Sequence, residues 1–379
     1  MYPFLPSCTS VTPVLYRHSH TGNCVPGNND IPDGAGVYVQ RVLRLNRPPV
    51  SRDSTRMLIV CCIAQHLAMR ESYLGRILFH KRSPRSRWLH TLGAHAEGMF
   101  LRLFWLLARS MSPERASATG RALISRLGPR THKHHRLTGN LELAFPELGA
   151  AQREILARKI WGNLGAVMAE YPHLGTMVTG SCSPFVDVIM HEDSRKIFAG
   201  RQPAIYVTAH LANWELVAAT IARSGIPLSV IYGPQRNPVL ERMLQRQRKS
   251  LGCRFIAREN GVRQLLRELR AGRSVGLLPD QRVEKGEPVP FFGRQAPTSI
   301  TPAWLALKLE CPLIPVQVER TGNARFRTVF HRPVTSVDQE KTGVDPVQLT
   351  TELNRIFESW IRRQPEQWLC MKRRWLPDT

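Results

Sequence analysis

The stretch that decides the fold is residues 203–223, PAIYVTAHLANWELVAATIAR. Its short apolar segment at 204–208 follows a proline and predicts a buried strand. A polar turn that contains His210 and Glu215 comes next, and a helix is predicted through residue 223. A second apolar segment at 228–232 predicts another strand. Strand, helix and strand in this order favour an α/β sheet.

The chain beyond this stretch repeats the same alternation of short strands and amphipathic helices. We expect helices at 238–250, 261–272, 300–309 and 346–363, and strands at 275–278, 313–318 and 325–330. In the helix at 261–272, Val262, Leu265, Leu266 and Leu269 share one face. The pattern predicts one α/β domain with a central mixed sheet flanked by helices.

Residues 1–87 differ in character from the rest of the chain. They are rich in Pro, Gly, Ser and Arg and show little periodicity, and their apolar piece at 57–68 is too short to span a bilayer. We interpret 1–87 as an N-terminal extension that is disordered or read from an early start codon. The organised domain is then expected at 88–379.

The first part of that domain combines apolar and basic residues. Residues 99–108, MFLRLFWLLA, predict a helix, and Ser112-Pro113-Glu114 starts a second helix that runs to residue 128. Residues 81–136 hold twelve Lys or Arg and two Asp or Glu. This combination is typical of amphipathic helices at a membrane interface, although a core helix with a solvated basic face is the alternative. Further helices are expected at 150–160 and 161–174.

The charge of the whole chain calls for an anionic partner. The 379 residues contain 53 Lys plus Arg and 29 Asp plus Glu, a formal net charge of +24. Nucleic acid, an anionic membrane and an acidic protein or substrate all fit this charge. No helix-turn-helix, aromatic RNA-binding motif or zinc-finger spacing supports a nucleic-acid-binding protein, so we expect no nucleic acid as partner. The eight cysteines form no C-x-x-C pair, and His132, His134 and His135 have no partners at metal-ligand spacing.

His210 and Glu215 are the candidates for chemistry. His210 is expected where a buried strand ends, a position at which sheet proteins present reactive groups. The spacing of Glu215 allows its carboxylate to return to one imidazole nitrogen, which would leave the other nitrogen as a general base. No G-x-S-x-G elbow or H-E-x-x-H motif suggests a serine nucleophile or a metalloprotease. A core pair without catalytic function is the alternative interpretation of the same two residues.

The turn TAHLANWEL at 208–216 resembles the signature of the late acyltransferases of lipid A biosynthesis, the lauroyl and myristoyl transferases of the glycerolipid acyltransferase superfamily. Further stretches match in order, and the resemblance covers about residues 88–379. They are NLELAFPE at 140–147, YGPQRNPVLE at 232–241, LLPDQ at 277–281, VPFFG at 289–293, CPLIPVQVER at 311–320, PEQW at 365–368 and RRW at 373–375.

The resemblance implies transfer of a fatty acyl chain from an acyl carrier protein thioester to a hydroxyl of a lipid A precursor. His210 would be the general base and Glu215 its orienter, without a covalent acyl-enzyme and without cofactor or metal. Arg248 and Asp280 carry over as substrate-binding residues, with Arg246 and Gln281 beside them as further candidates. Trp214 is a candidate wall of the acyl site.

The same resemblance implies a place at the cytoplasmic face of the bacterial inner membrane, as a peripheral or monotopic protein. A coenzyme A thioester as donor, and another glycolipid such as mannosylated phosphatidylinositol as acceptor, stay open.

Overall fold

The computed structural model describes residues 86–178, 183–258, 261–334 and 345–376. The chain separates into two units, Met1–Val60 and Cys61–Thr379, and every described residue belongs to the second unit. Apart from its last two residues, the extension expected at 1–87 lies outside the described residues. The first described helix, α3, spans Ser86–Arg109.

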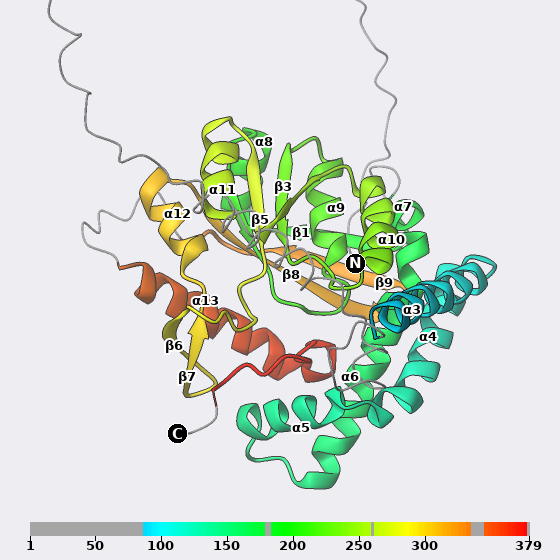
Figure 1. Ribbon diagram of the computed structural model, residues 1–379. Helices are drawn as coiled ribbons and strands as arrows, with labels where there is room; N and C mark the ends of the chain where they lie inside the picture. Colours follow the sequence, from blue (N-terminus) through cyan, green and yellow to red (C-terminus); the bar gives the residue numbers. More distant parts are fainter. Residues whose placement is uncertain (1–85, 179–182, 259–260, 335–344, 377–379) are drawn as a thin grey trace, which may run out of the picture. The chain divides into compact units, whose positions relative to one another are not determined.

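A seven-stranded sheet forms the centre of the second unit (Figure 1). Its order is β1-β9-β8-β2-β5-β3-β4, and all neighbouring strands run parallel except the antiparallel pair β8 and β9. The predicted mixed sheet is therefore confirmed. The strands are β1 Val186–Met190, β2 Ile205–Val207, β3 Leu228–Tyr232, β4 Arg254–Ala257, β5 Ser274–Leu277, β8 Leu313–Gly322 and β9 Arg325–Phe330.

Helices cover both faces of this sheet. Figure 1 shows α9 and α10 on one side and α11 and α12 on the other, with α13 next to α12. Such a two-sided cover buries β2 and β5 throughout and β3 over its first three residues, which explains their mostly apolar sequence. The helices are α8 Glu192–Ala199, α9 Glu215–Arg223, α10 Pro238–Arg248, α11 Gly261–Arg270, α12 Thr301–Leu309 and α13 Pro346–Arg363.

A two-stranded hairpin, β6 Glu287–Phe291 and β7 Arg294–Thr298, packs beside α13 (Figure 1). Its two-residue turn, Phe292-Gly293, has φ of 53° and 71°, the left-handed conformation that a tight hairpin turn needs at both positions. The Phe292 amide donates to Glu358 Oε1 of α13 at 2.6 Å. The sequence did not predict this hairpin because three prolines interrupt its strands.

Among the described residues, four long helices and one short helix precede the sheet: α3, α4 Pro113–Leu127, α5 Lys133–Ala144, α6 Ala150–Glu170 and the short α7 Leu174–Met177. Helices α4 and α6 approach closely at Gly120 and Gly165, where a Cβ on either residue would lie within 2.3 Å of the other's carbonyl oxygen. The two helices expected at 150–160 and 161–174 are largely one, α6. Its glycines allow this close packing and do not end the helix.

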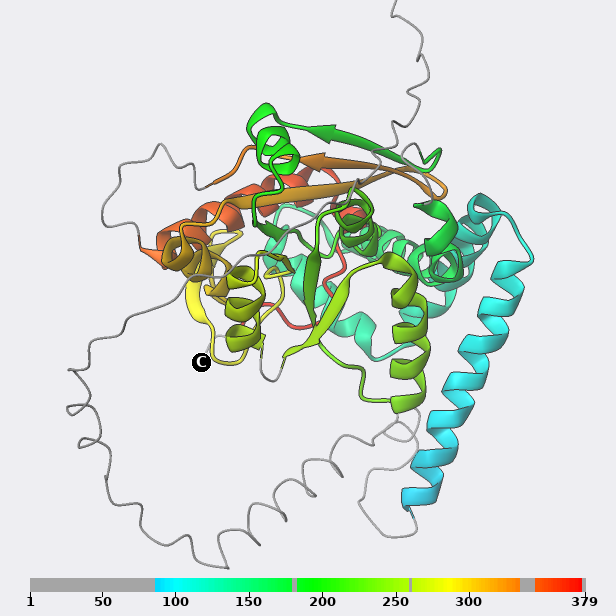
Figure 2. The same cartoon turned by 90° about the horizontal axis from the view of Figure 1, so that it is seen from above.

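Helix α3 runs alongside α10 (Figure 2). Leu101 and Trp105 are buried, and Asn237 at the start of α10 donates to the Ala94 carbonyl at 3.0 Å. The opposite side of α3 exposes large apolar side chains, namely Leu92, Met99, Phe100, Leu103, Leu106 and Leu107. Among the described helices, none has the length and apolar character that a membrane span requires.

Candidate active site

The site lies where parallel strands end. His210 follows β2 and Asp280 follows β5, and these two strands are neighbours in the sheet. The carboxyl ends of parallel strands are where open α/β sheets place ligands. The fold therefore brings together two residues that are 70 positions apart in the sequence.

His210 and Asp280 form a hydrogen-bonded pair. The His210 Nδ1 lies 2.7 Å from Asp280 Oδ1, while Asp280 Oδ2 accepts from the His210 backbone amide at 3.0 Å and from Trp368 Nε1 at 3.2 Å. Burial raises the pKa of the Asp280 carboxyl, but the contacts with His210 and Trp368 outweigh it and hold the pKa below its ordinary value. An ionised carboxylate at Nδ1 leaves the Nε2 lone pair free to take a proton.

The structure corrects the expected role of Glu215. Its carboxylate accepts from Tyr171 Oη at 2.5 Å and from Arg248 Nη2 at 2.6 Å, and no hydrogen bond to His210 occurs within the described part of the chain. Glu215 is the first residue of α9, whereas His210 lies in the preceding turn. The carboxylate that holds the imidazole is therefore Asp280, which we had expected to bind substrate.

The guanidinium of Arg248 contacts two aromatic rings and a carboxylate. Arg248 ends α10, and its guanidinium lies 5.3 Å from the Tyr232 ring centre and 5.1 Å from that of Phe255. Burial lowers the pKa of Arg248, but the Glu215 carboxylate and the Tyr171 hydroxyl overcome this effect and raise it above its ordinary value. The pair links the N-terminus of α9 to the C-terminus of α10, where the helix dipoles favour these signs of charge.

Of the other residues predicted for the site, two line the cavity and one does not. Gln281 and Trp214 line the same cavity as His210 and Arg248, and the Trp214 ring lies 5.2 Å from the imidazole, centre to centre. Arg246 is exposed on α10 and does not line this cavity. Of the two arginines, Arg248 is therefore the one that lines the cavity.

The turn after His210 is fixed by the C-terminal segment. The Leu369 amide donates to the His210 carbonyl at 2.8 Å, and the Ala212 amide donates to the Gln367 carbonyl at 3.0 Å. Ala212 has φ of 45°, a left-handed conformation that costs free energy in a residue other than glycine. Main-chain hydrogen bonds on both sides of Leu211 keep the turn in this shape.

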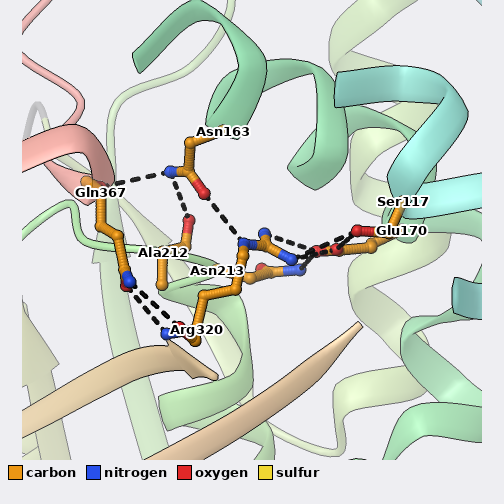
Figure 3. A network of polar contacts seen from close by, with 7 residues as sticks. All are labelled: Ser117, Asn163, Glu170, Ala212, Asn213, Arg320 and Gln367. Atoms are coloured by element: carbon orange, nitrogen blue, oxygen red, sulfur yellow. Dashed lines mark hydrogen bonds and ion pairs between the residues drawn. The ribbon is translucent and has the colours of Figure 1, made fainter. Parts of the chain in front are cut away.

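A buried polar network supports the same turn from below (Figure 3). Asn163 of α6 donates to the carbonyls of Ala212 and Gln367 at 3.3 and 3.2 Å and accepts from Arg320 Nε at 3.0 Å. Arg320 of β8 also forms an ion pair with Glu170.

Two more side chains complete this network (Figure 3). Asn213 Nδ2 donates to Glu170 Oε2 at 2.9 Å, and Ser117 Oγ donates to Glu170 Oε1 at 2.6 Å. Helices α4 and α6, strand β8 and the C-terminal segment are thereby tied to the turn that carries His210. No sequence pattern predicts a role for any member of this network, although Arg320 and Gln367 lie in stretches that resemble the acyltransferase motifs.

His210 opens into a cavity of about 2060 Å³. Its buried wall is apolar and includes Val217, Ile221, Leu228 and Val230. Exposed cationic side chains line it as well: Lys133, Arg136, Arg236, Arg258, Lys285 and Lys372. Because the apolar residues are buried and the cations exposed, the cavity has an apolar interior and a positively charged mouth. It exceeds the ~300–1,000 Å³ typical of small-molecule sites.

Among the described residues, no group of three or more His, Cys, Asp or Glu side chains is arranged to hold a metal ion. In the histidine tract before and within α5, His134 is partly buried. Its Nε2 lies 2.8 Å from Glu154 Oε2, and Trp161 Nε1 donates to its Nδ1 at 3.2 Å.

Comparison with known proteins identifies the family of this chain. The chain is 26% identical over 282 residues to the lipid A biosynthesis acyltransferase of Haemophilus influenzae, covering 72% of this chain and 85% of that protein. It is 25% identical over 256 residues to the lipid A biosynthesis myristoyltransferase of Escherichia coli K12, covering 65% and 77%. With the lipid A biosynthesis lauroyltransferase of the same organism it shares 22% over 240 residues, covering 62% and 76%. The model of the bacterial lipid A biosynthesis acyltransferases matches residues 80–377, and the chain belongs to this family.

Proposed function

We propose that this acyltransferase transfers a fatty acyl chain from an acyl carrier protein thioester to a hydroxyl of a lipid A precursor. The observation that carries the proposal is the His210–Asp280 pair at the wall of a large cavity with an apolar interior and a cationic mouth. A fatty chain suits the apolar wall, and the phosphates of the acceptor and the acidic carrier protein suit the mouth.

In the proposed reaction, His210 Nε2 takes the proton of the acceptor hydroxyl as its oxygen attacks the thioester carbonyl. The C–S bond breaks, and the imidazolium returns the proton to the departing thiolate. A thiol has an ordinary pKa of about 8.5, so this leaving group needs little acid assistance. Asp280 stabilises the imidazolium that forms between the two proton transfers. The sequence motifs give no nucleophile at this site, and the mechanism passes through no acyl-enzyme.

Glu215 and Arg248 take a different part in this proposal. Because Arg248 already holds the Glu215 carboxylate on the cavity wall, the pair fixes the distance between α9 and α10, which border the apolar interior. Because Glu215 compensates the charge of Arg248, the pair contributes to the proposed reaction by positioning the cavity wall.

The exposed apolar side of α3 supports a peripheral place on a membrane. Phe100 of α3 and the adjacent Leu101 line the cavity that contains His210. With α3 in the lipid interface, the cavity would open next to the bilayer that holds the acceptor. We propose the cytoplasmic face of the inner membrane, where a carrier-protein donor is present.

Mass spectrometry of lipid A from cells with and without the gene tests the function. The deletion should remove one secondary acyl chain, and wild type should restore it. His210→Ala should not restore it, whereas His135→Ala, a matched change of an exposed histidine outside the cavity, should. Full restoration by His210→Ala would contradict the mechanism.

An unchanged lipid A profile would contradict the acceptor and direct the search to other glycolipids. Purified enzyme supplied with acyl carrier protein or coenzyme A thioesters then separates the two donors, since the proposal expects faster transfer from the carrier protein.

A further inference from the structure

The most distinctive feature of the cavity mouth that the mechanism does not use is a group of cations. Arg236 lies in the loop between β3 and α10, Arg258 follows β4, and Lys372 lies in the C-terminal segment. All three line the cavity of His210. They come from separate parts of the chain, and the fold alone brings them to one opening.

These cations influence one another. Lys372 is exposed as a residue, but its ammonium loses part of its hydration at the cavity mouth, and this lowers its pKa; the positive charges of Arg258, Lys133 and Arg236 lower it further. Asp280 acts in the opposite direction, which places Lys372 within electrostatic reach of the catalytic pair. The three cations thus line the cavity that contains His210, and the charges of both arginines act on Lys372 there.

The three side chains also lack protein counter-ions. Within the described residues, Arg236, Arg258 and Lys372 take part in no ion pair or side-chain hydrogen bond, in contrast to Arg248, which Glu215 neutralises. Like charges held together repel one another, and a bound anion relieves that repulsion.

The backbone around two of these cations is fixed. Asn140 Nδ2 donates to the carbonyls of Cys370 and Lys372 at 2.6 Å each, and Asn140 Oδ1 accepts from the Arg374 amide at 3.0 Å. Next to Arg236, the side chain of Asn237 bonds Ala94 and Glu97 of α3. These hydrogen bonds fix the backbone positions from which Arg236 and Lys372 extend.

We infer that Arg236, Arg258 and Lys372 form a phosphate-binding site that anchors a phosphate ester of a substrate beside His210. A guanidinium binds phosphate oxygens through two parallel hydrogen bonds, and an ammonium adds a point charge. This inference rests on the proposed function, because it assigns the binding of one of its two substrates. Two sources have the required chemistry: a phosphate monoester of the acceptor, and the phosphodiester of a pantetheine-type donor.

Steady-state kinetics of the purified full chain in detergent tests the site. The variants are Arg236→Gln, Arg258→Gln and Lys372→Gln, and the matched control is Arg263→Gln, an exposed α11 arginine outside the cavity. Each acceptor is assayed with and without its phosphate monoester, and each donor with and without its phosphodiester. A short N-acetylcysteamine thioester serves as the donor without phosphate.

We expect each site variant to raise the KM of one phosphorylated substrate about tenfold or more, the size of a lost charge-assisted hydrogen bond, with kcat changed less than about threefold. With that substrate's phosphate removed, variant and wild type should become equal. A KM effect confined to the acceptor assigns the acceptor phosphate, and one confined to the donor assigns the phosphodiester. Unchanged KM values in an active enzyme, or equal losses with and without phosphate, would overturn the site.

Binding of inorganic pyrophosphate, followed by calorimetry at low salt, separates this inference from the proposed function. Wild type and Arg263→Gln should bind it, and Arg236→Gln/Arg258→Gln should bind at least about tenfold more weakly. An enzyme that binds pyrophosphate in this way but transfers no acyl chain would refute the function and keep the site. Equal binding by all three proteins would refute the site.

Discussion

Replacement of Asp280 by asparagine removes one charge while keeping the shape of the side chain. Asp280 accepts three hydrogen bonds, from His210 Nδ1, the His210 amide and Trp368 Nε1. The amide can satisfy the last two donors only if its oxygen faces them. Its NH₂ group then donates to Nδ1 and forces the proton of the neutral imidazole onto Nε2. Asp280→Asn should therefore fold and retain all three hydrogen bonds, but present the wrong tautomer to the substrate.

The size of the effect follows from the geometry. The side chains of His210 and Asp280 are 20% and 0% exposed, so water screens this pair weakly. Unit charges about 4 Å apart at an effective dielectric constant of about 20 interact by about 4 kcal/mol. Loss of that interaction with the imidazolium lowers the rate by about 10³-fold, before the tautomer effect is added.

The assay is single-turnover transfer with saturating acceptor, which reports the chemical step. Asp187→Asn is the matched control, because Asp187 is an exposed carboxylate whose one ion pair within the described residues is with Arg327, at 3.4 Å. The control should keep wild-type rates, and Asp280→Asn should keep wild-type circular dichroism. A folded Asp280→Asn enzyme with more than about a tenth of the wild-type rate would refute the assigned role of Asp280.

Three further outcomes are expected. Arg320→Met should lower the free energy of unfolding in urea by about 3–5 kcal/mol because Glu170 is left buried and unpaired, and Glu170→Met/Arg320→Met should recover part of it; a loss below about 1 kcal/mol for the single variant would contradict this. Leu103→Asp on α3 should weaken flotation with anionic vesicles about tenfold or more, whereas an unchanged partition would argue against the lipid contact. The pKa of Asp280 is lowered by folding, so its charge stabilises the protein above the unfolded carboxyl pKa of about 3.9. The difference in unfolding free energy between wild type and Asp280→Asn should therefore shrink as the pH falls through the folded pKa, and a difference that grows toward acid would contradict it.

The sequence was informative wherever local pattern and tertiary environment agree. The strands expected at 204–208 and 228–232 and the helices expected at 261–272 and 346–363 all occur, within a few residues at their ends. Strands β1 and β4 were missed because they are short and mostly not buried: three consecutive residues of β1 are exposed, and both end residues of β4 are exposed. Both lie at edges of the sheet, where β1 pairs with β9 and β4 pairs with β3. This pairing stabilises them as strands, and the local sequence does not reveal it.

The candidate site was predictable in its members but not in its pairings. His210 and Glu215 were named from their spacing, and Arg248 and Asp280 from the family resemblance. In the structure they form two pairs, and His210, Glu215 and Arg248 line one cavity. The spacing between His210 and Glu215 suggested a contact that the turn geometry does not make. A carboxylate 70 residues away takes that place because β2 and β5 are neighbours, a fact that belongs to topology.

The two carboxylates of the site have opposite environments, and this difference separates their roles. Asp280 faces an imidazole that changes its charge during the proposed reaction, so its own charge acts on the proton transfer. Glu215 faces Arg248, whose charge is permanent, and a hydroxyl of Tyr171 whose pKa burial and Glu215 raise well above its ordinary value. Because a permanent cation compensates its charge, the Glu215 carboxylate does not respond to the proton transfer at His210. Its effect on the reaction must come through the position of Arg248 and of the helices α9 and α10 that the ion pair joins. The sequence motif that contains His210 and Glu215 thus holds two residues with separate roles. His210 belongs to the proton transfer, and Glu215 belongs to the cavity wall.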